Sequence, residues 1–292
     1  MRASPDPPIV GFSRALYSNW LLHVPLQLLV DAGEGLQVAL GPRLYVPTHL
    51  AITHGHADHL LGLPGFVAAR RFSKGSREKP LSILHPAGTP EIEVVRDVIA
   101  RLWRGVDFPV TWTPLQPGDR VDLDRNRYVE AFRSNHGNGG PTLGYLVAER
   151  RRRLRAEWAG LPQAEIERRA RAGHRADMTE EFSHVLFAHT GDAMPVAPAG
   201  IAGADLLVHD ATFLDADDRK WDIHATTEEA LEVARDAGVG CLVLHHLSIR
   251  YERGDVIPRL RRQVESVGFE AACWWLHDGE CRRVSGGATV TP

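Results

Sequence analysis

Short apolar runs alternate with longer amphipathic segments along most of the chain, and the two kinds of segment predict strands and helices in turn. The apolar runs end at glycine or at polar clusters, which is typical of strands. We expect strands at residues 20–30, 49–53, 81–85, 110–112, 128–132, 144–147, 184–188, 205–208, 241–244 and 270–276. Apolar spacing predicts helices at residues 90–104, 227–237 and 255–266. This alternation favours one layered α/β domain over residues 1–292.

Two of the predicted helices carry start signals at their N-termini. Thr89 is placed to cap the first helix, with Pro90 in its first turn. Thr226 and Glu229 have the spacing of a capping box before the second. We therefore expect both helices to begin at these residues.

Composition limits the classes of protein that this chain can belong to. It has 292 residues, 43% of them hydrophobic, which is enough to bury a sizeable core. Its 34 Lys and Arg residues are balanced by 37 Asp and Glu residues, so any basic surface for nucleic acid must be local. Three widely spaced cysteines form no disulfide framework. Without a signal peptide or a bilayer-spanning segment in the sequence, we expect a cytoplasmic protein.

The strongest chemical signal is a run of histidines after the strand at residues 49–53. Three imidazoles and a carboxylate occur within six residues, at His54, His56, Asp58 and His59. Imidazole nitrogen and carboxylate oxygen are ligands of zinc-like divalent ions. On an extended segment His54 and His56 share one side and can hold one ion, whereas Asp58 and His59 can face a second. The alternative is a polar loop of hydrogen-bonded histidines.

This run resembles the His-x-His-x-Asp-His motif of the metallo-β-lactamase fold superfamily, and further segments are similar to its ribonuclease Z branch. The segments that carry this resemblance, in chain order, are residues 31–37, 135–137, 141–145, 190–192, 209–213, 224–226 and 245–251. Together they cover most of the chain. Residues 9–14 keep little of the branch's usual first strand. The resemblance implies a four-layer αβ/βα sandwich of two mixed β-sheets flanked by helices, with metals at one edge.

The resemblance also implies a set of metal ligands. A first ion is held by His54, His56 and His136, a second by Asp58, His59 and His246, and Asp192 bridges the two. The implied cofactor is a pair of Zn²⁺ ions, with Mn²⁺ or Fe²⁺ as alternatives. His245 competes with His246 for the last position. On a strand the two side chains point to opposite faces, and the motif favours His246.

Two residues are predicted to be catalytic. Asp58 is one, because losing this ligand should abolish hydrolysis. His224 is the other, since the resemblance places it beside the scissile phosphate, where it could stabilise charge or protonate the leaving oxygen. The alternative for His224 is a neutral ring that merely lies at a helix N-terminus. Metal-bound imidazoles need a hydrogen-bond partner at their outer nitrogen, and we expect His209 or Asp210 to supply one.

Residues 149–178 differ in character from their surroundings, and we expect them to form a substrate-binding or lid insertion. Five arginines lie within residues 150–155, near Trp158. Arg151 and Arg152 could bind RNA phosphates, or the segment could be an exposed, salt-bridged helix. A second basic cluster, Arg70, Arg71, Lys74, Arg77 and Lys79, could add a rim or lie in a surface loop. Arg250 could hold a phosphate oxygen or pair with an internal carboxylate.

Three functions remain open at this point. The first is a dinuclear zinc phosphodiesterase similar to ribonuclease Z, whose metal-bridged hydroxide attacks a phosphodiester at an RNA 3′ end, as in tRNA 3′ processing. The second is a hydrolase of the same fold that acts on a cyclic nucleotide, another small phosphodiester or a lactone. The third is a binding protein with an idle site. An extended arm at residues 149–178 would favour RNA, whereas a lid over the metals would favour a small substrate. A homodimer is compatible with each function.

Overall fold

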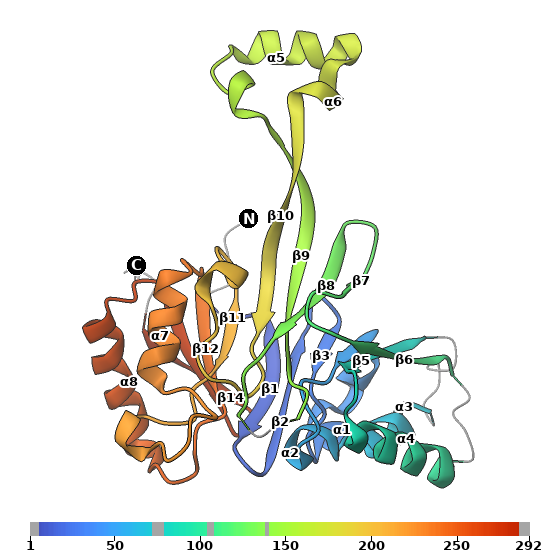
Figure 1. Cartoon of the computed structure of the whole chain (residues 1–292), viewed down its shortest axis with the longest axis vertical. Helices are drawn as coiled ribbons and strands as arrows, with labels where there is room; N and C mark the ends of the chain where they lie inside the picture. Colours follow the sequence, from blue (N-terminus) through green and yellow to red (C-terminus); the bar gives the residue numbers. More distant parts are fainter. Residues whose placement is uncertain (1–5, 72–78, 104–107, 138–139, 286–292) are drawn as a thin grey trace.

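Two mixed β-sheets form the centre of the protein. The computed structural model describes residues 6–71, 79–103, 108–137 and 140–285 (Figure 1). The six-stranded sheet has the order β1-β2-β3-β4-β5-β6, with β1 (Ile9–Arg14), β2 (Ser18–His23), β3 (Leu28–Val30), β4 (His49–Ala51), β5 (Leu81–Pro86) and β6 (Val110–Leu115). Strands β3 to β6 pair in parallel, and β1 and β2 are antiparallel.

The second sheet has eight strands in the order β14-β13-β12-β11-β10-β9-β8-β7. Its strands are β7 (Arg120–Asp122), β8 (Arg127–Arg133), β9 (Leu143–Leu154), β10 (Thr179–His189), β11 (Leu207–Asp210), β12 (Cys241–His245), β13 (Ala272–His277) and β14 (Glu280–Ser285). Strands β10 to β13 are parallel, and the pairs outside them are antiparallel.

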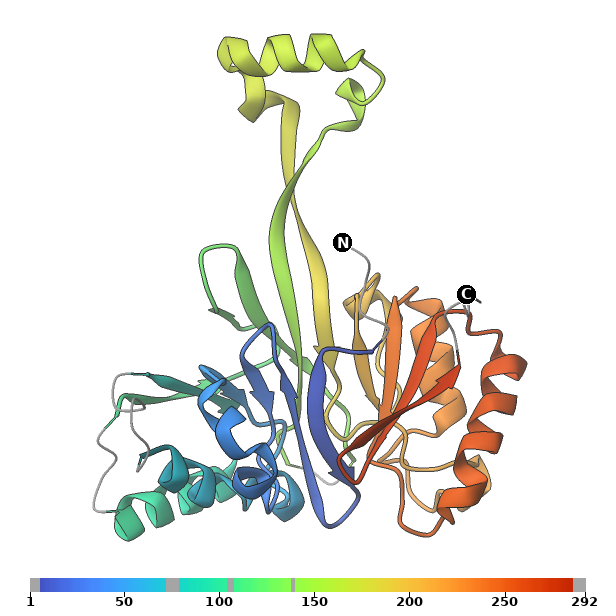
Figure 2. The ribbon, with the colours of Figure 1, turned by 180° about the vertical axis from the view of Figure 1, so that it is seen from behind.

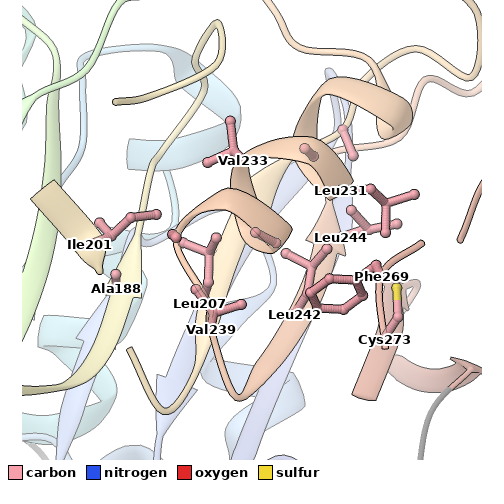
Figure 3. Close-up of a cluster of buried hydrophobic side chains, with 14 of the residues drawn as sticks. Ala188, Ile201, Leu207, Leu231, Val233, Val239, Leu242, Leu244, Phe269 and Cys273 are labelled. Atoms are coloured by element: carbon pink, nitrogen blue, oxygen red, sulfur yellow. The ribbon is translucent and has the colours of Figure 1, made fainter. Parts of the chain in front are cut away.

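Buried side chains define the four layers. Residues of both sheets, such as Leu84 and Val243, share one apolar cluster, so the sheets face each other. A second cluster joins the outer face of the eight-stranded sheet to α7 (Thr227–Asp236) and α8 (Arg253–Val267) (Figure 3). A third joins the six-stranded sheet to α1 (Leu36–Leu40), α3 (Leu63–Arg71) and α4 (Pro90–Trp103). The predicted αβ/βα sandwich is confirmed.

Strand β12 shows how one strand serves two layers. Leu242 and Leu244 point toward the outer helices, and Val243 points between the sheets. Both faces of this parallel strand are thus buried, which explains its uninterrupted apolar sequence. The alternation also sends His245 to the face between the sheets.

Several predicted elements need correction. The apolar stretch 20–30 is not one strand but the hairpin of β2 and β3, because Pro25 has no amide hydrogen and Gln27 adopts a positive φ of 51° between them. Strands β1, β7 and β14 were not predicted. The helix starts were predicted correctly, and the capping box of Thr226 and Glu229 is present. No helix in the described ranges is long and apolar enough to span a membrane.

Residues 150–183 form an arm that leaves the body of the protein (Figures 1 and 2). Strand β8 pairs with β9 only up to Glu149, and beyond that residue β9 pairs with β10 alone. At the tip lie α5 (Gln163–Arg169) and α6 (Arg175–Met178). Helix α2 (Ala57–Leu60), which carries part of the histidine motif, lies at the opposite end of the body. The arginines of residues 150–153 therefore lie on a strand, and the helical alternative applies only to the tip, at residues 163–178.

Candidate metal centre

The seven predicted ligands come from four loops at one edge of the sandwich. Residues 54–59 follow β4 and enter α2, and His136 follows β8. Asp192 follows β10, and His246 follows β12 with a left-handed φ of 63°. The carboxyl ends of strands β4, β10 and β12 meet at this edge, where loops of α/β proteins commonly bind ligands.

The structure brings these side chains together in two groups. Within each group the potential ligand atoms lie within 4.8 Å of one another. The first group contains His54, His56, His136 and Asp192, and the second contains Asp58, His59 and His246. A third group overlaps both, because Asp192 and His246 also lie within this distance of His224. The first two groups correspond to the ligand sets that the sequence predicts for two ions.

Asp192 lies between the two groups. Its Oδ2 is 3.8 Å from His54 Nε2 and 3.1 Å from His246 Nε2, and its Oδ1 is 3.3 Å from His59 Nε2. Asp58 Oδ2 lies 3.6 Å from both His59 Nε2 and His246 Nε2. One carboxylate therefore faces ligands of both groups, as a bridging ligand must.

Three of these atoms are buried and make no hydrogen bond to a described residue. His54 Nε2, His246 Nε2 and Asp192 Oδ1 make no hydrogen bond within the part of the chain that the structure describes. Buried polar atoms are almost always hydrogen-bonded, so an unsatisfied set converging on one point indicates a missing ligand. Nitrogen and oxygen donors of this kind fit a divalent transition-metal ion.

Hydrogen bonds at Nδ1 orient the imidazoles of His59 and His246. His59 Nδ1 lies 2.8 Å from Asp31 Oδ2, and Thr53 donates to Asp31 from both its amide and its hydroxyl. His246 Nδ1 lies 2.9 Å from Thr212 Oγ1. Because Nδ1 is occupied in this way, Nε2 is left to face the other groups.

Neighbouring charges and burial shift the pKa values of the clustered side chains. Burial would raise the pKa of Asp192, but the nearby His246 and His59 hold it well below its usual value. Burial would lower the pKa of His59, but Asp192 and Asp31 raise it well above the ordinary value. Burial, together with the neighbouring His59, lowers the pKa of His54. Asp192 is therefore ionised and His54 neutral, the forms in which both bind metals.

The chain resembles known proteins over most of its length. The model of the "Beta-lactamase superfamily domain" matches residues 27–247. Ribonuclease Z of Haloarcula marismortui is 34% identical over 251 residues, which cover 77% of this chain and 78% of the relative. Ribonuclease Z of Methanothermobacter thermautotrophicus is 33% identical over 275 residues, covering 86% and 87%. The chain belongs to the ribonuclease Z family.

Solved structures show the same fold. The metallo-β-lactamase fold protein YhfI from Bacillus subtilis aligns with a TM-score of 0.65 at 18% identity, covering 94% of this chain and 99% of that one. The short form of human tRNase Z aligns with a TM-score of 0.59 at 24% identity, covering 83% and 93%. As a member of the ribonuclease Z family, the protein is a metal-dependent hydrolase.

His224 lies in this ribonuclease Z-like site beside the two groups. Its ring stacks on His246 with centroids 5.0 Å apart, and it lies 4.6 Å from the ring of His136. Its Nδ1 is 2.6 Å from Asp210 Oδ2. Burial would lower the pKa of His224, but the Asp210 carboxylate raises it to about 9. This pairing favours the protonated ring over the neutral one.

The supporting residues differ in part from the prediction. His209 is fully buried, but its Nδ1 lies 2.7 Å from the carbonyl of Asp210 and it contacts none of the predicted ligands. Asp210 supports His224, while Asp31 supports His59. Asp31 was not predicted in this role, although an aspartate that ends a buried strand beside the motif was a usable signal. His245 is directed toward His189, with ring centroids 4.7 Å apart, so only His246 reaches the site.

A cavity of about 340 Å³ opens next to the first group. Its walls are His54, His56 and His136 on one side and residues 88–91 and 140–142 on the other. The cavity gives a substrate direct access to the imidazoles, and its volume is typical of small ligand sites.

The predicted substrate contacts lie at two separate places. Arg250 donates to the backbone carbonyl of Asp218, lies 3.8 Å from its carboxylate and covers the ring of Phe213. It therefore pairs with a carboxylate, as one of the two alternatives had it, but at the surface. Arg151 and Arg152 are on the arm, away from the ligands. Arg151 bonds to Glu149, whereas Arg152 reaches only the hydroxyl of Thr179.

The second basic cluster is not a continuous rim. Arg70 is fully buried and donates to the backbone carbonyls of Leu44 and Lys79. The ammonium of Lys79 donates to two further backbone carbonyls. These contacts tie the chain together locally. Lys74 and Arg77 lie outside the described residues.

Proposed function

We propose that the protein is a dinuclear, zinc-dependent phosphodiesterase of the cytoplasm that removes the 3′ trailer of precursor tRNA. The observation that carries this proposal is the position of Asp192 between two groups of candidate ligands, each with one buried imidazole nitrogen that makes no hydrogen bond in the described part of the chain. The chain's relatives are named ribonuclease Z. His54, His56 and His136 would hold one Zn²⁺ ion and Asp58, His59 and His246 the other.

The residues divide the chemistry between them. When bound, two zinc ions would supply Lewis-acid stabilisation of the phosphoryl oxygens and an activated water. Asp192 would offset the repulsion between the two positive charges. Asp58 is held in place by the side-chain amide of Asn19 and the backbone amide of Leu16. This anchoring keeps its carboxylate aimed at the second group.

His224 would act on the leaving oxygen. Because Asp210 occupies Nδ1, only Nε2 is available to donate a proton or to stabilise the charge that develops on the phosphoryl group. Asp210 also accepts hydrogen bonds from the amides of Ala193 and Thr212. These bonds fix the carboxylate and, through it, the imidazole.

The charge and the extended shape of the arm favour an RNA substrate. Within residues 150–183, nine arginines face five glutamates and one aspartate, so the arm carries a net positive charge. Leu143 at the start of β9 bonds to Thr53, next to His54, and from there the strand carries the arm about 36 Å away from the ligands, at roughly 3.3 Å per residue. An arm that extends away from the site suits a long polyanion better than it suits a small substrate that must be enclosed. In a homodimer, the arm of one copy could hold an RNA that enters the site of the other.

A small-molecule hydrolase is the second candidate, because the 340 Å³ cavity could hold a small phosphodiester. The deciding experiment compares zinc-loaded enzyme on bis(p-nitrophenyl) phosphate and on a precursor tRNA with a 3′ trailer, each with a chelated control. We expect chelator-sensitive removal of the trailer. Cleavage of the small diester alone would support the hydrolytic site and favour the second candidate, a hydrolase that acts on a small molecule. Size-exclusion chromatography of the same sample tests the homodimer.

A further inference from the structure

Trp221 is an exposed aromatic residue three positions before His224. Its side chain is 71% exposed, more than any other aromatic residue described by the structure. A large indole in water contributes no burial to the fold, and exposed aromatic residues near a functional site are characteristic of ligand contacts. Three residues of chain span at most about 11 Å, so Trp221 lies close to the proposed proton donor.

The backbone that carries Trp221 is fixed although its ring is free. The carbonyl of Ile223 lies 2.9 Å from His136 Nδ1. The same loop packs on Gly137, where an added Cβ would come within 2.6 Å of Ile223 Cγ2. Arg219 bonds to Glu229 and to the carbonyl of His224. The backbone of Trp221 is therefore held close to the two histidines, and the indole is free to turn toward a ligand.

The charges around Trp221 also suit a nucleotide. The aspartates of this loop are partly neutralised, since Asp222 pairs with Arg219 and Asp218 with Arg250. The adjacent Lys220 is exposed and has no hydrogen bond or ion pair within the described ranges. An exposed aromatic residue next in sequence to an unpaired lysine offers the two kinds of contact, to a base and to a phosphate, by which proteins bind single-stranded nucleic acid.

We propose that Trp221 is a stacking platform for an unpaired RNA base that borders the cleaved bond, with Lys220 contacting a neighbouring phosphate. This inference rests on the proposed function, because it names the part of the RNA that the same site holds. The contact would position the strand without taking part in the chemistry. It therefore contributes to KM rather than to kcat.

The test compares Trp221→Ala, Trp221→Phe and wild type on precursor tRNA. Leu102→Ala, which removes an apolar side chain that is 60% exposed on α4, is the matched control. Stacking predicts that Trp221→Ala raises KM roughly 5- to 150-fold and leaves kcat unchanged, whereas Trp221→Phe retains most of the affinity. The control should behave like wild type.

A second arm uses RNAs that lack the base at one of the nucleotides flanking the cleaved bond. At one of these positions, loss of the base should raise the KM of wild type as much as Trp221→Ala does. The same loss should not raise the KM of Trp221→Ala further. Equal KM values for wild type and Trp221→Ala would overturn the proposal. So would additive effects of base removal and substitution on KM at every position. In either case, cleavage of the trailer by wild type would still support the proposed function.

Binding to chelated enzyme separates the two proposals further. Fluorescence anisotropy with a labelled single-stranded RNA needs no catalysis. If wild type fails to cleave precursor tRNA, the proposed function fails, and the platform stands only if Trp221→Ala still weakens this binding. Equal binding by both proteins would overturn it.

Discussion

His224 Nδ1 lies 2.6 Å from Asp210 Oδ2, and on its other side the imidazole stacks on His246. The same aspartate bonds to Thr212, whose hydroxyl lies 2.9 Å from His246 Nδ1. One buried carboxylate thus connects the proposed proton donor with a proposed metal ligand. The position of His224 relative to the second group is therefore fixed by the fold and does not depend on substrate.

His224→Ala should lower kcat by ~10² or more and leave the metal content intact, because the imidazole is no metal ligand in the proposed mechanism. Asp210→Asn should give a kcat between those of wild type and His224→Ala, since the ring is kept but its negative partner is lost. Trailer cleavage under saturating RNA measures kcat, and mass spectrometry of the purified proteins counts the metal. Normal turnover of His224→Ala would refute the assigned role.

Asp58→Ala should abolish hydrolysis with little effect on folding. Asp58 is a proposed ligand of the second ion, and it is partly exposed at the edge of the sandwich rather than in the core. The measurements are cleavage rate, zinc per chain and the circular dichroism spectrum. Asp97→Ala, an exposed acid on α4, is the matched control and should retain both metal and activity. Full activity of Asp58→Ala would remove this residue from the site.

Asp31→Asn should lower zinc affinity about 10- to 100-fold, the usual effect of removing the carboxylate behind a metal-bound histidine. The amide can still accept a hydrogen bond from Thr53, but it no longer offers His59 a negative partner. Competition with a zinc chelator measures the affinity. Unchanged affinity would mean that the negative charge of Asp31 is not needed to orient His59.

The residues of the site were easier to predict than the shape of the arm. Ligands at residues 54–59 are adjacent in sequence, and metal chemistry restricts them to a few residue types. The arginines at 150–153 form a strand only because residues 180–183 pair with them across the arm, a contact that lies about 30 residues away in the chain. Their composition is equally compatible with a helix.

Two further differences also come from tertiary contacts. Asp31 adopts a positive φ of 58°, which turns its carboxylate toward Thr53 and His59, and no local pattern predicts that orientation. Trp20 to Val30 is largely apolar, interrupted by His23 and Gln27, because both strands of its hairpin are buried. Uniform burial removes the alternation that would have marked the turn.

Arg152→Ala should weaken RNA binding and reduce the slope of log affinity against log salt by roughly 0.7 to 0.9, the effect of losing one phosphate contact. Arg151→Ala should have a smaller effect, because that guanidinium is bonded to Glu149. Neither variant should change hydrolysis of bis(p-nitrophenyl) phosphate, which does not reach the arm. Identical salt slopes for wild type and Arg152→Ala would show that this side of the arm does not contact RNA.

His23 should make the fold less stable in mild acid. Its ring is 6% exposed and lies 5.0 Å from the ring of Phe187, and its Nδ1 accepts the amide hydrogen of Leu26. Burial lowers the pKa of His23 to about 4, so between pH 6.5 and 4 the unfolded chain binds a proton that the folded chain refuses. The contribution of His23 to the free energy of unfolding is therefore fully present above pH 6.5. It falls by about 2 kcal/mol between pH 7.5 and 5.0.

Urea unfolding in chelator at the two pH values measures the loss for wild type and for His23→Asn, which keeps an acceptor but has no titrating group. The variant should lose about 2 kcal/mol less than wild type, whereas His174→Asn, at an exposed position on the arm, should follow wild type. Equal losses for wild type and His23→Asn would show that His23 is protonated in the folded protein.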